Sequence, residues 1–191
     1  MSGGIDRQKI FENDEDRDHF LSRLGIILTE TKTDCYAWAL IPNHFHLLLR
    51  TGNVSISTTM RRLLTGYALW YNRRHHRYGH LFQNRYKSIL CQEDAYLLEL
   101  VRYIHLNPLR AGLVPDLKTL DNHPYSGHGV LMAKVNRDWQ NTDKVLELFS
   151  EKSGTARQIY RRFVNKGIDQ EKRTDLTGGG LVRSVGGDGL R

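Results

Sequence analysis

The sequence predicts an α+β fold, an antiparallel sheet covered by helices. Three segments carry apolar residues at helical spacing, and two strand-like segments joined by Pro42 and Asn43 lie between the first two of them. The length of 191 residues suits one compact domain with an appendage, and a hydrophobic content of 39% is enough for a core. No apolar run reaches the length of a transmembrane helix.

The first helix is expected to begin at Asn13 or Asp14, either of which can cap it, and to run to about Thr31. One face of this helix is apolar, formed by Phe20, Leu21, Leu24, Ile27 and Leu28.

A β-hairpin should follow the first helix. Alternating aromatic and small residues predict a strand over Cys35–Leu40, and Pro42 with Asn43 forms the turn. The chain then returns as a second strand over His44–Arg50.

A second and a third helix are predicted beyond the hairpin. Ser55 or Ser57 opens the second helix, which continues to about Arg74, and Asp94 caps the third. The segment Tyr86–Cys91 between them is expected to be another strand.

The chain divides into three parts on this prediction. Residues 1–120 form the main domain, residues 121–166 a helical appendage, and residues 167–191 a flexible, glycine-rich tail. Within the appendage, Thr142–Ser150 and Gly154–Lys166 have helical patterns, whereas Ser126–Arg137 is poorly patterned.

Two histidines on the second strand and two polar residues on the third helix are the candidate catalytic residues. Successive strand side chains point to opposite faces, so His44 and His46 project together, about 7 Å apart, and can converge on one divalent ion. Tyr103 and Asn107 share one face of the helix, where they would supply a nucleophile and an oxygen ligand. This combination indicates metal-assisted chemistry on a phosphodiester.

Structural roles explain the same residues one at a time. The histidine pair is also typical of a polar sheet face, and Tyr103 of a packing residue with its hydroxyl at the edge. Asn107 precedes Pro108 and is equally consistent with the end of the helix.

A basic, aromatic segment between the second helix and the following strand is the candidate DNA-binding region. A formal net charge of +7 and a pI near 9.5 favour a polyanionic partner. Single-stranded nucleic acid needs cations for phosphates and aromatic faces for unstacked bases. A solvated loop docked by its aromatic residues is the alternative. The candidate residues are Arg73, Arg74, Arg77, His80, Phe82, Arg85, Tyr86 and Lys87.

The chain from Asp6 to about Asp169 resembles the HUH-type single-tyrosine transposases, specifically the REP-associated branch of these insertion-sequence transposases. Four motifs carry the resemblance, in this order: ENDEDRDHFL (Glu12–Leu21), YAWALIPNHFHLLL (Tyr36–Leu49), GHLFQNRYKSIL (Gly79–Leu90) and YLLELVRYIHLNPLRAGLV (Tyr96–Val114).

The resemblance implies a ferredoxin-like fold of the HUH endonuclease type, with residues 1–120 as the transposase domain. It also implies that His44, His46 and Asn107 bind a divalent metal ion, Mg²⁺ or Mn²⁺, and that Tyr103 is the nucleophile. The expected substrate is single-stranded DNA beside a hairpin from a palindromic repeat. The family includes monomers and homodimers, and no residue here decides between them.

The two ends of the chain depart from the family pattern. In the tail, residues 175–187 resemble only the beginning of an extension that leads, in longer relatives, towards a helical DNA-binding segment, so this tail is expected to be truncated. Relatives carry a central strand before the first helix, and residues 1–7 resemble only its tail, so the strand His44–Arg50 is expected to lack a neighbour. This leaves open a non-catalytic, single-stranded DNA-binding protein as the alternative function.

Other classes of protein fit less well. A (β/α)₈ hydrolase, which also uses paired histidines, needs about 250 residues. Relaxases and replication initiators place the histidines and the tyrosine in other contexts. The start of the chain has no apolar signal region, and Cys35 and Cys91 lie far apart, so we expect a cytoplasmic protein without membrane contact.

Overall fold

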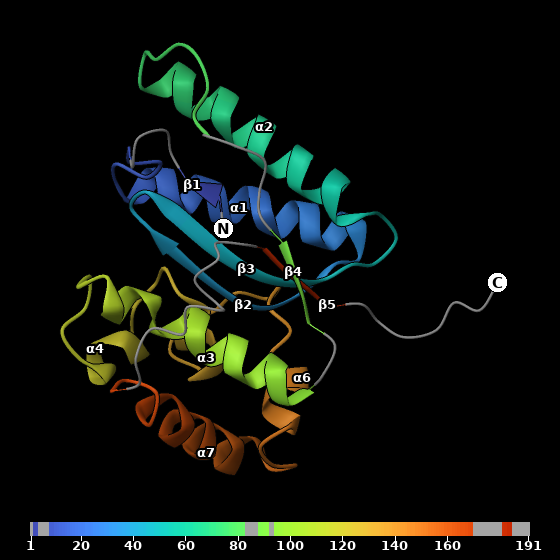
Figure 1. The fold of residues 1–191 in the computed structure, drawn as a ribbon, viewed down its shortest axis with the longest axis vertical. Helices are drawn as coiled ribbons and strands as arrows, with labels where there is room; N and C mark the ends of the chain where they lie inside the picture. The colour runs from blue at the N-terminus through green and yellow to red at the C-terminus, as the bar shows by residue number, and fades with distance from the viewer. Residues whose placement is uncertain (1, 4–7, 83–87, 92–93, 170–180, 185–191) are drawn as a thin grey trace.

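The computed structural model describes residues 2–3, 8–82, 88–91, 94–169 and 181–184. Its sheet lies between two helical layers, so the predicted α+β class is confirmed (Figure 1). One face is covered by α1 (Asp14–Thr31) and α2 (Ile56–Arg74), and the other by α3 (Asp94–Arg110). Outside α3 lies α7 (Ser153–Asn165). The short helices α4 (Leu117–Asp121), α5 (Gly127–Leu131) and α6 (Asp143–Glu147) lie between α3 and α7 in sequence, and α5 contacts β2 directly.

The start of α1 follows from a capping box. Asn13 accepts a hydrogen bond from the backbone N–H of Asp16 at 3.1 Å, and the Asp16 carboxylate accepts one from the backbone of Asn13 at 3.4 Å. The helix ends where Lys32 adopts a left-handed conformation, with φ of 51°. The predicted bounds of this helix are confirmed.

The hairpin of β2 (Asp34–Ile41) and β3 (His44–Arg50) forms the antiparallel centre of the sheet. Phe45 and the apolar residues at alternate positions after it pack into the core beneath α1 and α2. His44, His46 and Leu48 therefore face the other layer, which contains α3.

The second edge of β3 is paired, contrary to the prediction of a missing neighbour. The short strand β1 (Ser2–Gly3) pairs antiparallel with His44 and Phe45. Further along β3, β5 (Leu181–Ser184) pairs in parallel with residues 48–50 and joins β4 (Ser88–Cys91) to the sheet, also in parallel. The sheet is therefore mixed, where the sequence predicted an antiparallel one.

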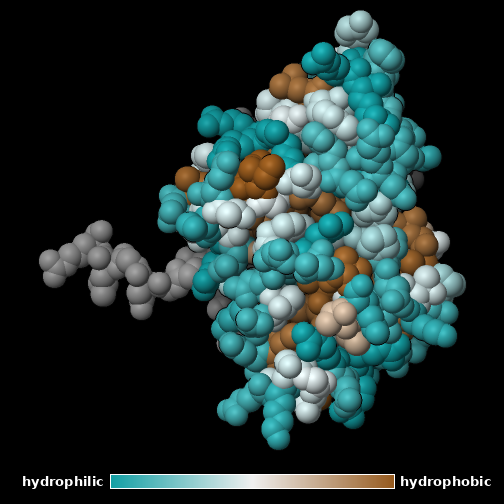
Figure 2. All heavy atoms as spheres, turned by 180° about the vertical axis from the view of Figure 1, so that it is seen from behind, coloured by the Kyte–Doolittle hydropathy of each residue, from teal (hydrophilic) through white to brown (hydrophobic). Residues whose placement is uncertain are grey.

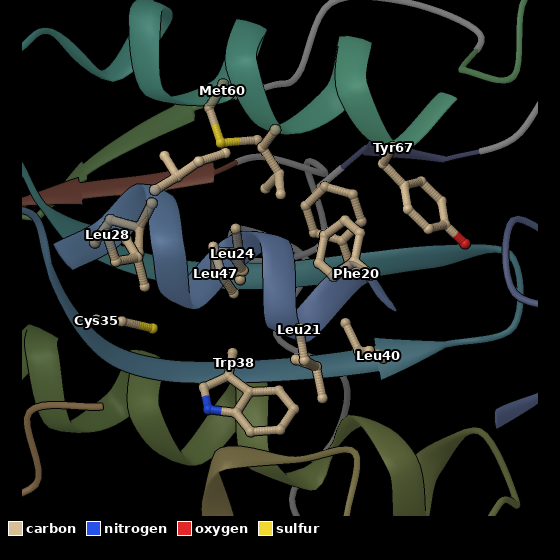
Figure 3. Packing of buried hydrophobic residues seen from close by; sticks show 14 of the residues in the cluster. Phe20, Leu21, Leu24, Leu28, Cys35, Trp38, Leu40, Leu47, Met60 and Tyr67 are labelled. Carbon is tan, nitrogen blue, oxygen red and sulfur yellow. The ribbon is translucent and has the colours of Figure 1, made fainter. Parts of the chain in front are cut away.

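Each face of the sheet has its own apolar core. Figure 3 shows the first core, in which Phe20 and Leu24 of α1 pack together with Met60 and Tyr67 of α2. Leu47 of β3 belongs to the same core. The second core joins β2 and β3 to α3 and the appendage helices. Figure 2 shows the face opposite to that of Figure 1, where hydrophilic side chains dominate and apolar ones form separate small patches. Among the described residues, no helix is both long and apolar enough to cross a membrane.

The appendage packs against the outer face of α3. Val145, Ala156, Tyr160 and Val164 are all fully buried there. The two helices predicted at its C-terminal end correspond to α6, which is shorter than predicted, and α7, which begins and ends one residue earlier than predicted. The helix α4 was not predicted, and α5 lies within the poorly patterned segment Ser126–Arg137.

Candidate active site

The two histidines of β3 lie side by side beneath α3. Their ring centroids are 5.1 Å apart with the planes at 83°. Both positions are fixed by the hairpin register, which pairs Ile41 with His44 and Ala39 with His46. The predicted common orientation of the two side chains is therefore present in the structure.

Each imidazole presents a nitrogen suited to binding a metal ion. His44 Nδ1 lies 2.7 Å from the side-chain oxygen of Asn43, which only accepts, so Nδ1 carries the hydrogen and Nε2 keeps its lone pair. His46 Nε2 is buried and has no hydrogen-bond partner. Burial lowers the pKa of His44 to about 4 and that of His46 well below its usual value, so both rings are neutral near pH 7. Neutral imidazole is the metal-binding form.

Tyr103 comes from α3 onto the same site. Its ring meets the His46 ring edge-on, with centroids 5.8 Å apart and planes at 90°. No described residue hydrogen-bonds the Tyr103 hydroxyl. Burial raises the pKa of Tyr103, and the positive charge of Arg110 partly offsets that rise. The phenol therefore needs help to act as a nucleophile near neutral pH.

Helix α3 continues through Pro108, and Asn107 explains how it does so. Pro108 has no N–H for the carbonyl of Ile104, four residues earlier. The Asn107 side-chain nitrogen donates to the carbonyls of Tyr103 at 2.9 Å and Ile104 at 3.4 Å. The reading of Asn107 as a helix end is therefore wrong. With its nitrogen occupied, the amide oxygen is the atom that remains for a ligand.

A complete metal centre of histidines, cysteines and acidic residues is not formed. Among the described residues, no group of three such side chains could hold a metal ion. A metal held by the histidine pair would need an oxygen ligand of another kind. Asn107 is the candidate for this oxygen ligand, because it lies four residues after Tyr103 on the same face of the helix.

Arg110 also belongs to this site, and the sequence analysis missed it. Its guanidinium carbon lies 5.5 Å from the centroid of the Tyr103 ring. The spacing of seven residues from Tyr103, two helical turns, is the signal that would have indicated it.

The predicted DNA-binding residues that the structure describes differ in their surroundings. Arg73 and His80 are exposed, and Phe82 is half-buried at the edge of the core, 6.4 Å from Phe45 between ring centroids. Arg74 forms an ion pair with Glu15. Arg77 donates to the side chain of Gln8 at 2.8 Å. Arg85, Tyr86 and Lys87 lie outside the described residues.

An apolar groove of about 310 Å³ lies beside these residues, between the end of α2 and the turn that follows it. Leu69, which is 69% exposed, and His80 both line it. The groove brings an apolar surface next to the exposed Arg73, as binding of an unstacked base requires.

The opposite face of α3 carries a buried hydrogen-bond chain that joins it to the appendage. His105 Nδ1 lies 2.8 Å from the Tyr160 hydroxyl, which is 2.7 Å from His128 Nδ1. His128 Nε2 lies 2.9 Å from a carboxylate oxygen of Asp121, and Arg161 donates to the other oxygen at 2.9 Å. The four groups from His105 to Asp121 all lie on different helices, α3, α7, α5 and α4.

This hydrogen-bond chain has one consistent arrangement of hydrogens when the imidazoles of His105 and His128 are both neutral. The carboxylate of Asp121 only accepts, so His128 Nε2 carries the hydrogen and Nδ1 accepts from the Tyr160 hydroxyl. The Tyr160 oxygen then accepts from His105 Nδ1. Burial lowers the pKa of both histidines, in agreement with neutral rings.

Comparison with known families gives one match. The family model described as "Transposase IS200 like" matches residues 4–107, more than half of the chain, and this range includes His44, His46, Tyr103 and Asn107. Comparison with curated proteins and with solved structures finds no match. The chain therefore belongs to the family of IS200-like transposases.

Proposed function

We propose that this protein is a DNA transposase that cleaves and rejoins single-stranded DNA through Tyr103. Membership of a transposase family indicates DNA transposition and a DNA partner. The observation that carries the finer proposal is the contact between Tyr103 and His46, which joins a tyrosine of α3 to a metal-competent histidine pair on β3.

A divalent ion, Mg²⁺ or Mn²⁺, fits the residues present. His44 and His46 would hold it through Nε2, because one of these atoms keeps its lone pair and the other is buried without a partner. Asn107 would add its amide oxygen. A set of two nitrogens and one oxygen suits Mn²⁺ better than Mg²⁺, because imidazole is the softer ligand. When bound, such an ion polarises the scissile phosphate and stabilises the leaving oxygen.

The reaction is a transesterification at phosphorus. The Tyr103 hydroxyl loses its proton as its oxygen forms a bond to phosphorus, the bond to the 3′ oxygen breaks, and that oxygen takes up a proton to leave as a 3′-hydroxyl, so one proton is lost and one is gained. The 5′ end stays on the protein as a phosphotyrosine. A free 3′-hydroxyl reverses the step by attacking phosphorus and releasing Tyr103, so strand transfer and religation need no ATP.

The proposed substrate is single-stranded DNA beside a hairpin from a palindromic repeat, as in the REP-associated branch that the motifs resemble. The exposed Arg73 and His80, with Phe82 at the groove, support contacts to a strand that crosses the end of α2. A DNA substrate of this kind implies action in the cytoplasm. Either a monomer or a homodimer is compatible with this proposal.

A denaturing-gel assay for a covalent protein–DNA adduct tests the proposal. The protein is incubated with labelled single-stranded DNA of random sequence, enriched in hairpins, with Mn²⁺, with Mg²⁺ or with EDTA. We expect an adduct that requires metal and disappears in Tyr103→Phe, in His44→Ala and in His46→Ala.

Tyr96→Phe is the matched control, because it removes a hydroxyl from the same helix two turns before Tyr103. Its adduct should equal that of the wild type. An adduct that persists in Tyr103→Phe would exclude Tyr103 as the nucleophile. DNA binding without any adduct would instead identify a non-catalytic single-stranded DNA-binding protein.

A further inference from the structure

Two features hold Arg110 against the Tyr103 ring, namely its position on α3 and a hydrogen bond to Gly167. Helical spacing of four and three residues places Tyr103, Asn107 and Arg110 on one face of α3. The guanidinium carbon of Arg110 lies 5.5 Å from the Tyr103 ring centroid, and its Nη2 donates to the carbonyl of Gly167 at 3.2 Å. Gly167, two residues after the end of α7, therefore holds the guanidinium beside the tyrosine.

A second arginine of the same helix shows what is unusual about Arg110. Arg102 also points to the appendage, where it lies 4.3 Å from the Phe163 ring centroid, and its charge is balanced by Glu99 at 2.5 Å. Arg110 forms no ion pair with any described residue, and its Nη1 is buried without a hydrogen-bond partner. Burial lowers the pKa of Arg110, because loss of water disfavours the charged form.

An unbalanced guanidinium with an unused buried donor is costly, and such groups need an explanation. Guanidinium is the side chain best matched to phosphate, since its donors form a planar fork. We propose that Arg110 is a phosphate-contacting residue of this site, with Nη1 donating to a non-bridging oxygen of the DNA phosphate beside Tyr103. This inference rests on the proposed function, because it takes the ligand at Tyr103 to be DNA.

The test measures equilibrium binding, so that it does not depend on cleavage. All variants are made in the Tyr103→Phe background, and labelled single-stranded DNA of random sequence is titrated by fluorescence anisotropy from about 50 to about 200 mM salt. We expect Arg110→Gln to weaken binding about tenfold. Loss of one phosphate contact should also reduce the slope of log K against log salt by about 0.7.

Arg102→Gln is the matched control, because it makes the same change on the same helix at an arginine that an acid already neutralises. Its salt slope should equal that of the parent. Arg110→Lys keeps the charge and loses the fork, so it should bind more weakly with an unchanged slope. Thermal melting of each variant establishes that it is folded.

The inference is overturned if folded Arg110→Gln has the affinity and slope of its parent, or if Arg102→Gln lowers the slope equally. If Arg110→Gln does not fold, the inference is overturned by a folded Arg110→Lys whose slope of log K against log salt is smaller than that of its parent. The adduct assay separates the two proposals. A reduced slope without an adduct supports Arg110 as a phosphate contact and rejects Tyr103 as the nucleophile, whereas an adduct with an unchanged slope leaves Arg110 as a link to Gly167 only.

Discussion

Removal of the Tyr160 hydroxyl should destabilise this protein more than removal of any ordinary buried hydroxyl. Tyr160 is fully buried, and its oxygen is hydrogen-bonded to both His105 and His128. Tyr160→Phe therefore leaves two buried imidazole nitrogens without partners. Each orphaned group costs about 1–3 kcal/mol, which gives a loss of about 2–6 kcal/mol. That is a large part of the about 5–15 kcal/mol that stabilises a typical domain.

Tyr67→Phe provides the comparison. Tyr67 is equally buried, and its hydroxyl donates at 2.5 Å to a single partner, the carbonyl of Ile10. The same chemical change then orphans one group, at a cost of about 1–3 kcal/mol. Both tyrosines lose the same atom, so differences in the unfolded state largely cancel.

The assay is urea unfolding followed by circular dichroism, with the free energy of unfolding obtained from the midpoint and the m-value. We expect Tyr160→Phe to lose about twice as much free energy as Tyr67→Phe, with unchanged m-values. A loss for Tyr160→Phe equal to or smaller than that for Tyr67→Phe would refute the two-sided hydrogen-bond chain.

Three further predictions concern acid, metal and the first helix. His105 and His128 take up protons near pH 6.5 in the unfolded chain but stay neutral in the folded one. The free energy of unfolding should therefore fall below about pH 6.5, by up to about 1.4 kcal/mol per pH unit for each histidine. Urea midpoints that stay constant down to about pH 5 would contradict this. Mn²⁺ at about 100 times its dissociation constant should stabilise the protein by about 2.7 kcal/mol, seen as a rise in Tm that His46→Gln abolishes; an equal rise in both proteins would show that the ion binds elsewhere. Asn13→Ala should cost about 1 kcal/mol in urea unfolding and Asn13→Asp almost nothing, because only alanine removes the cap; equal losses would argue against the capping box.

The elements predicted from the sequence are those that local signals determine. The cap at Asn13 and the apolar stripe after it set α1. The two-residue turn at Pro42 and Asn43 fixes the register of the hairpin, and that register places His44 and His46 on one face. The candidate histidines were therefore predictable in orientation as well as in identity.

The elements that were missed depend on distant partners. Residues 181–184 form β5 only because the far edge of β3 offers unpaired backbone groups to them, and no pattern in these four residues indicates that. The hydrogen-bond chain that links His105 to Asp121 was missed for the same reason. Its members come from four helices, and no local sequence pattern marks any of them. Periodicity reports which face of an element is apolar, but not which polar side chains meet inside.

Asn107 shows how a local rule fails when a side chain replaces a backbone group. The rule that a helix ends before proline assumes that the carbonyl four residues earlier is left without a donor and that the ring crowds it. In α3, the Asn107 amide supplies that donor to Ile104 and bonds Tyr103 as well, so the helix continues to Arg110. The continuation of α3 and the placing of Arg110 beside Tyr103 thus have one cause, because a helix that ended at Asn107 would not carry Arg110 back over the Tyr103 ring.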